Sequence, residues 1–200
     1  VEEALVAAVS DPATCGKLAA IFTRCAEEGG QEIYQSLLPL LMLNGIEELF
    51  VLLNDTLVPQ FLFNYLCDVV DDVAHEDEVK RLIRVLGRFG AAAVPRATEL
   101  SQPVPARSGR LRSAAINILG GTREDRAVEP LIACLGDANS FIVDRAASAL
   151  IRLGPELALT NVIGVLGSRA AVPTLQQMQL SALRILERYL DEPNLARQLT

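Results

Sequence analysis

The 200-residue chain contains no tryptophan, a single histidine and only 4% aromatic residues. Nucleic-acid grooves commonly stack bases on aromatic side chains, so this composition disfavours nucleic-acid binding. The net charge of −7 would also repel phosphate. Any serine or cysteine nucleophile would have only His75 as its base, and no glycine-rich segment ends in the G-K-[ST] of a phosphate loop. We therefore expect no enzymatic activity and no cofactor.

The sequence also lacks the cysteine and histidine spacings typical of metal sites and disulfide-rich proteins. The cysteines form no CxxC pair and lie within apolar helical patterns, which predicts buried free thiols in a reducing compartment. They are Cys15, Cys25, Cys67 and Cys134. Acidic residues surround His75 between residues 71 and 78, but the run lacks the spacing of a calcium-binding loop or of an H-E-x-x-H motif. We expect a solvated turn there, with Asp77 and Glu78 at the start of a helix, and no metal site.

No segment is apolar enough to cross a membrane. The longest apolar run, residues 36–54, is interrupted by Asn44, Gly45, Glu47 and Glu48. The chain begins with VEEALVAAV, which has acids where a secretion signal needs bases. Val1 in place of Met is expected of an excised domain or a trimmed chain. We expect a cytoplasmic protein that binds no membrane.

Charge is distributed unevenly along the chain. Residues 1–79 carry 15 acidic side chains and two basic ones, a net charge of −13, whereas residues 80–200 carry a net +6. Sixteen of the 18 basic residues are arginine. The asymmetry raises the hypothesis of head-to-tail self-association, which salt would weaken because it screens charge attraction.

The most regular stretch, residues 122–154, reads as two amphipathic helices joined by a polar turn. Thr122 and Asp125 fit a capping box. Apolar residues then recur at helical spacing over 126–135, and again from Phe141 to Leu153. Gly154 suits a left-handed helix end, and Pro155 begins the next element.

Parts of this stretch recur. Ala92-Ala93-Val94-Pro95 matches residues 127–130 and 170–173, and residues 112–119 match residues 144–151. Recurrence at this period predicts stacked helical hairpins. We expect helices over 2–9, 13–28, 30–42, 44–54, 58–73, 76–89, 91–101, 108–120, 125–136, 139–153, 156–167 and 172–190, with a short cap near 193–199. Two registers stay open near the end: residues 156–167 and 172–190 pair with each other, or the helix from Val172 opens a new hairpin.

Residues 127–154 resemble a HEAT repeat, and more narrowly the short HEAT-like form of phycobilisome lyase-type proteins. The resemblance rests on Pro130, the Leu131 and Leu135 stripe, Asp137 in the turn, and Val143 with Arg145 opening the second helix before Ala146-Ala147 and Leu150. In the family pattern an arginine follows the valine directly, but here Asp144 intervenes. The resemblance is fair over 91–120 and 170–190 and weak over 1–75.

This resemblance implies an all-α fold, a right-handed α-solenoid of stacked helical hairpins like HEAT and armadillo superhelices. We expect roughly five to six helix pairs in a single domain over 1–200. Residues 1–75 would form an irregular helical half and residues 76–200 the regular repeats. Such folds serve scaffold, adaptor, enzyme-accessory and chaperone roles alike, so the fold alone does not select the function.

Second helices line the concave face in such repeats, which makes their arginines the expected partner-binding residues. They are Arg81, Arg84, Arg88, Arg107, Arg110, Arg112, Arg145 and Arg152. We expect a non-enzymatic protein-interaction module whose basic middle third binds an acidic protein surface. In the competing interpretation these arginines only solvate the helices and pair with Glu99, Glu124 and Glu129. An accessory or chaperone subunit of a lyase-type modifying enzyme is the alternative function.

The leucine-rich segment between residues 37 and 65 has more apolar side chains than one helix face requires. Most should pack between helices. The remainder would form an exposed patch that docks a partner or a second copy.

Overall fold

The computed structural model describes residues 11–28, 38–169 and 174–191. Within these ranges the regular elements are all helices and no strand occurs, which confirms the all-α prediction. The chain divides into two compact units, Val1–Ala93 and Val94–Thr200, called the N-terminal and C-terminal units below. The expected single domain and right-handed superhelix remain predictions.

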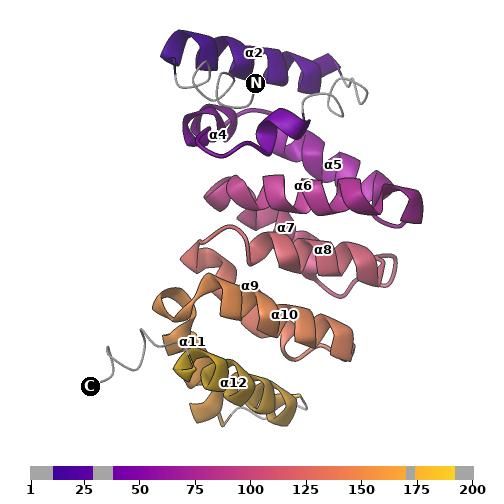
Figure 1. Cartoon of the computed structure of the whole chain (residues 1–200). Coiled ribbons are helices and arrows are strands. Elements are labelled where there is room, and N and C mark those ends of the chain that lie inside the picture. Colours follow the sequence, from indigo (N-terminus) through magenta and orange to yellow (C-terminus); the bar gives the residue numbers. More distant parts are fainter. Residues whose placement is uncertain (1–10, 29–37, 170–173, 192–200) are drawn as a thin grey trace. The chain divides into compact units, whose positions relative to one another are not determined.

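In the N-terminal unit, helix α2 (Pro12–Glu28) packs on α4 (Glu47–Leu53) and α5 (Val58–Val69), and α5 packs on α6 (Glu76–Arg88) (Figure 1). Helix α5 ends at Val69, four residues before its predicted end. Asp72 is the reason, because its carboxylate accepts the Ala74 N–H and starts the 3-10 turn η1 (Val73–His75). The helix expected over 2–9 and most of that expected over 30–42 lie outside the described residues.

Aromatic and leucine side chains fill the core of the N-terminal unit. Phe22, Phe63 and Phe89 are fully buried, and the rings of Phe50 and Phe89 meet edge to face with centroids 4.8 Å apart. The leucine-rich segment is therefore mostly core. Val51 and Leu52 are exceptions, because they lie on the exposed side of α4.

The C-terminal unit contains three helical hairpins (Figure 1). They are α7 (Val94–Ser101) with α8 (Gly109–Leu119), α9 (Val128–Cys134) with α10 (Ser140–Leu153), and α11 (Pro155–Gly167) with α12 (Leu175–Leu190). A 3-10 turn, η2 (Gly90–Ala92), precedes α7, and another, η3 (Asp125–Ala127), precedes α9. First helices stack on first helices, since α9 contacts α7 and α11, and the second helix α10 contacts α8 and α12. This stacking is a helical repeat.

The structure shows how the last two helices pair, which the sequence left open. Helix α11 packs on the first helix α9 and helix α12 on the second helix α10, so α11 and α12 pair as first and second helices. A buried hydrogen bond strengthens the α10–α12 contact, because the Tyr189 hydroxyl donates to the Leu150 carbonyl at 2.7 Å.

Two glycines shape the turns of the C-terminal unit. Gly154 has φ of +87°, a conformation that side chains with a Cβ rarely adopt, and this confirms its predicted role at the end of α10. A Cβ on Gly120 would lie 2.7 Å from the Ala149 Cβ, so Gly120 allows α8 and α10 to approach closely. The predicted capping box is wrong: the Thr122 hydroxyl donates back to the Leu119 carbonyl, and η3 begins after Glu124 without a side-chain cap.

Candidate functional site

The eight arginines predicted to bind a partner fall into two structural classes. Three lie in the N-terminal unit and five in the C-terminal unit, so each group is described within its own unit. Some donate to backbone carbonyls and hold loops in place. Others are exposed side chains on helices.

Arg88 is a structural residue of the N-terminal unit. Its Nη1 donates to the carbonyls of Leu41 and Leu43 at 2.9 and 2.5 Å, and its guanidinium lies 4.4 Å from the centre of the Phe50 ring. Glu47 is a weaker partner at 3.5 Å. Burial lowers the pKa of Arg88, and Glu47 opposes this shift. The sequence-based placement of Arg88 on a free binding face is therefore corrected.

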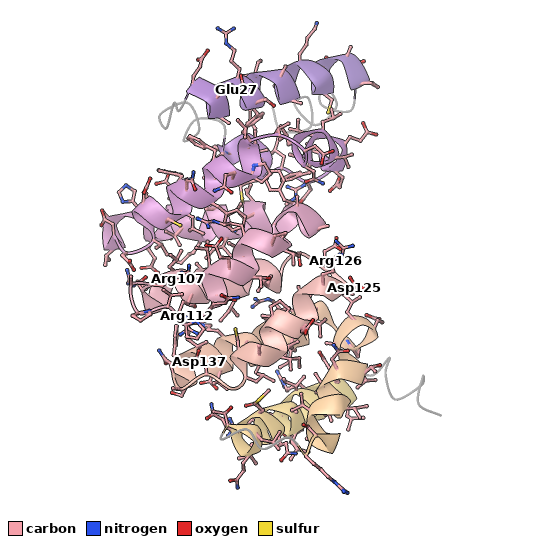
Figure 2. The ribbon with its side chains drawn as sticks, turned by 180° about the vertical axis from the view of Figure 1, so that it is seen from behind. Glu27, Arg107, Arg112, Asp125, Arg126 and Asp137 are labelled. Carbon is pink, nitrogen blue, oxygen red and sulfur yellow. The ribbon has the colours of Figure 1, made fainter. Side chains whose placement is uncertain are left out.

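Arg112 is buried, with 8% of its surface exposed, and this corrects its predicted solvent-facing position. Its Nε donates to the Ser101 carbonyl at 3.0 Å, and its two terminal nitrogens donate to the two carboxylate oxygens of Asp137. Figure 2 shows Arg112 and Asp137 at the same end of their hairpins. These bonds connect α7, α8 and the turn after α9, so the role of Arg112 is structural.

The carboxylate of Asp137 stays charged in this setting. Burial by itself would raise the pKa of Asp137. The hydrogen bonds from Arg112 and from the Asn139 N–H, together with the charge of Arg112, outweigh burial and lower that pKa. Gln177 on α12 donates to the Asp137 carbonyl at 3.0 Å, which adds the third hairpin to the same contact.

Arg107 also closes a loop. Its Nη1 donates to the Glu99 carbonyl and, at 3.4 Å, to the Gln102 carbonyl, and its Nη2 lies 3.7 Å from the Glu99 carboxylate. Arg96 pairs with the same carboxylate at 2.5 Å. The predicted pairing of arginines with Glu99 is confirmed, and the described residues form no ion pair through Glu124 or Glu129.

The other predicted arginines are exposed. Arg81 and Arg84 extend from α6 in the N-terminal unit, and Arg84 donates only a long 3.4 Å bond to the Lys80 carbonyl. Arg110 lies in the first turn of α8. Arg145 and Arg152 lie on α10, seven residues apart, which is two helical turns or about 10 Å along the helix axis.

Arg145 and Arg152 form an exposed basic pair on α10. Neither forms an ion pair with a carboxylate in the described part of the chain. Partial burial lowers the pKa of Arg152, and the positive charge of Arg145 lowers it further. Two cations therefore repel each other across one helix face, and an anion between them would relieve that repulsion.

Two neighbouring residues belong to this surface and were not predicted. Phe141 was expected in the apolar stripe of α10, but the residue is 46% exposed, and the Arg145 guanidinium lies 4.8 Å from the centre of its ring. Asn117 on α8 accepts a 3.0 Å hydrogen bond from the Arg152 Nη2. The spacing of four residues between Phe141 and Arg145 is the sequence signal that could have identified the stacked pair. We call Asn117, Phe141, Arg145 and Arg152 the α10 surface.

A hollow of about 180 Å³ lies between the α7–α8 loop and α9. Pro103, Pro130 and Cys134 line it together with the Arg112–Asp137 pair. Its charged groups already bind each other, and burial raises the pKa of the Cys134 thiol, so the hollow presents neither a free charge nor a thiolate.

The histidine, the cysteines and the acidic residues do not form a metal-binding cluster within the described ranges. No group of three or more histidine, cysteine or acidic side chains could hold a metal in the described ranges. His75 contacts Asp72 at 3.1 Å in a partly exposed turn, and Asp77 and Glu78 lie in the first turn of α6 as predicted. The four cysteines are free thiols. Three are buried as predicted, and Cys67 is partly exposed.

In the described residues, no single helix combines the length and apolarity needed to cross a membrane. Helices α4 and α5 reach that length only together, and they meet at a bend of 92°.

Comparison with known families identifies one repeat. Residues 111–137 match the family model of the PBS lyase HEAT-like repeat, which confirms the resemblance drawn from the sequence. No curated protein matches the chain. The matched segment begins in α8 and ends at Asp137, so it contains both members of the Arg112–Asp137 pair. One segment of the chain is thus similar to a HEAT-like repeat, within a fold whose described residues form helices and no strand.

Proposed function

We propose that the protein is a non-enzymatic interaction module, and that the α10 surface binds an acidic surface of a partner protein. The observation that carries the proposal is the pair of exposed arginines, Arg145 and Arg152, which have no carboxylate partner in the described residues. A carboxylate of a partner would supply the missing counter-charge.

The aromatic member of the surface supports a protein ligand. Tryptophan, tyrosine and arginine dominate the energetics of protein interfaces, and aromatic side chains in general are enriched there. Phe141 is exposed and stacked with Arg145, so it offers apolar area beside a charge. Arg81 and Arg84 form a second exposed basic site on α6, and we propose that they contribute to binding from the N-terminal unit.

A lyase-accessory role has less support. The segment that matches the PBS lyase HEAT-like repeat consists mainly of buried residues such as Ala114, Ala115, Leu119 and Leu131, together with the buried Arg112. These residues hold hairpins together in any repeat of this kind, so the match supports the fold and does not point to a substrate. Purification of the protein with a bound coloured tetrapyrrole would favour the lyase role instead.

The test is affinity capture from a native lysate, with bound proteins crosslinked and quantified by mass spectrometry. The bait variants are the wild type and the double charge reversal Arg145→Glu with Arg152→Glu. Arg126→Glu with Arg184→Glu is the matched control, because both of its arginines are exposed residues of the same unit and the charge change is identical. Figure 2 shows Arg126 at the opposite end of the hairpins from Arg112.

We expect the α10 reversal to abolish capture of an acidic partner and the control to retain it. If both variants capture the same proteins in the same amounts as the wild type, the α10 surface is not the binding site. Circular dichroism of each bait confirms that it is folded.

A further inference from the structure

The exposed side of α4 carries a stripe opposite in character to the α10 surface. Glu48, Val51 and Leu52 share one face of α4 at helical spacing of three and four residues, and Asp55 is an exposed residue of the turn between α4 and α5. Val51 is 68% exposed and Leu52 47%, although both are large aliphatic residues. Leu57, two residues beyond Asp55, is 56% exposed. We call these five residues the α4 stripe.

The acidic members of the α4 stripe are as free of counter-charge as the arginines of α10. Neither Glu48 nor Asp55 forms an ion pair within the described ranges. The surrounding unit is strongly acidic, with 15 acidic residues against six basic ones over 1–93. An exposed apolar stripe bordered by carboxylates fits a basic surface that also carries an apolar side chain.

The two surfaces are complementary in charge. Glu48 and Asp55 are seven residues apart, as are Arg145 and Arg152. Arg145 and Arg152 lie on one helix, whereas Asp55 lies in the turn after α4, where the chain bends before α5. The two carboxylates of the stripe match the two arginines in number and are opposite in sign. The exposed Val51, Leu52 and Leu57 offer apolar area to Phe141.

We infer that the α4 stripe of one copy docks on the α10 surface of a second copy, so that the protein self-associates head to tail. This inference rests on the proposed function, because it uses the same α10 surface and names its occupant. The contact joins two different surfaces, so each copy keeps one of them free for a further copy. Association therefore continues beyond the dimer, unless the array closes into a ring.

The test is light scattering coupled to size-exclusion chromatography of the full chain over a range of concentration and salt. We expect the mass of the wild type to exceed the monomer, to rise with concentration and to fall with salt. Two charge-reversed proteins are compared with it: Glu48→Arg with Asp55→Arg, and Arg145→Glu with Arg152→Glu. Each places like charges in the contact and should weaken self-association by more than about tenfold.

Mixing the two reversed proteins gives the decisive result. The arginines of the first protein's altered α4 stripe face the glutamates of the second protein's altered α10 surface, and the unaltered surfaces also match. We expect each variant alone to be monomeric and the equimolar mixture to assemble. Arg126→Glu with Arg184→Glu is the control and should associate like the wild type.

Three results would overturn the inference: a wild type that is monomeric at every concentration, association that the reversals do not change, or a mixture that stays monomeric. The proposed function is tested separately, because an acidic partner captured through the α10 surface by a monomeric wild type supports that function while it excludes self-docking. A wild type that captures no acidic partner and stays monomeric would refute both proposals.

Discussion

Arg112 and Asp137 form a buried ion pair across 25 residues of sequence, and the pair joins α8 to the turn after α9. Arg112 also donates to the Ser101 carbonyl, and the Asp137 carbonyl accepts from Gln177. One contact therefore links all three hairpins of the C-terminal unit. Its contribution to stability and its dependence on pH follow from this geometry.

Removing either partner of the pair should be costly. Arg112→Leu leaves Asp137 without its counter-charge, and Asp137→Asn leaves Arg112 unpaired in a buried position. Each single change should lower the free energy of unfolding by about 3 kcal/mol. Urea unfolding of the full chain measures this effect. The double variant should lose much less than the sum of the two single losses, and additive losses would show that the pair is not coupled.

Acid should weaken the same contact. The pKa of Asp137 is lower in the folded protein than the ordinary value near 3.9 of an unfolded aspartate, so the unfolded chain binds the proton more readily. The stabilisation is present above the unfolded pKa and is lost as pH falls through the folded one. Urea unfolding between about pH 5 and pH 2 should show a steeper loss of stability for the wild type than for Asp137→Asn. If stability falls equally with pH in the wild type and in Asp137→Asn, Asp137 is not the source of the acid sensitivity.

Gly120→Ala should destabilise the C-terminal unit by about 1–3 kcal/mol, because the new methyl group would lie 2.7 Å from the Ala149 Cβ and 2.9 Å from its Cα. Gly164→Ala is the matched control. A Cβ on Gly164, within α11, meets nothing inside 4 Å, and alanine favours a helix, so this variant should gain about 0.5–1 kcal/mol. Thermal unfolding of both variants tests the prediction, which fails if the two shifts have the same sign.

Arg88→Lys should lower the stability of the N-terminal unit, although it preserves the charge. A lysine cannot reproduce the planar contact with Phe50 while it donates to the carbonyls of Leu41 and Leu43. We expect a loss of about 1–2 kcal/mol in chemical unfolding. Arg84→Lys changes an exposed residue of the same helix and should have no measurable effect. If the two variants are equally stable, Arg88 does not have the structural role that its contacts indicate.

Much of the fold could be predicted from the sequence because its signals are local. Apolar spacing and the prolines located α9, α10 and α11 within a few residues, and Gly154 marked the end of α10. Errors arose where a side chain bonded to an unexpected backbone atom. Thr122 turned back to Leu119, and Asp72 ended α5 early.

The candidate site was harder to predict because identical residue types have different roles. Arg112 and Arg145 both precede an Ala-Ala pair, but at positions that differ by one residue. Arg112 therefore reaches Asp137, whereas the matching position on α10 holds the exposed Asp144 and Arg145 extends to the surface. A shift of one residue rotates a side chain by about 100° around a helix. The sequence contained this difference as the Asp144 departure from the family pattern, but only the packing revealed its consequence.

We propose that the α10 surface binds the partner and that the buried arginines of the hairpin turns do not. Hydrogen–deuterium exchange of the full chain, with and without the captured acidic partner, measures this most directly. We predict that added partner slows exchange in peptides covering Ser140–Leu153 and Gly109–Leu119. Slower exchange confined to other helices, with α10 unchanged by the bound partner, would contradict the account.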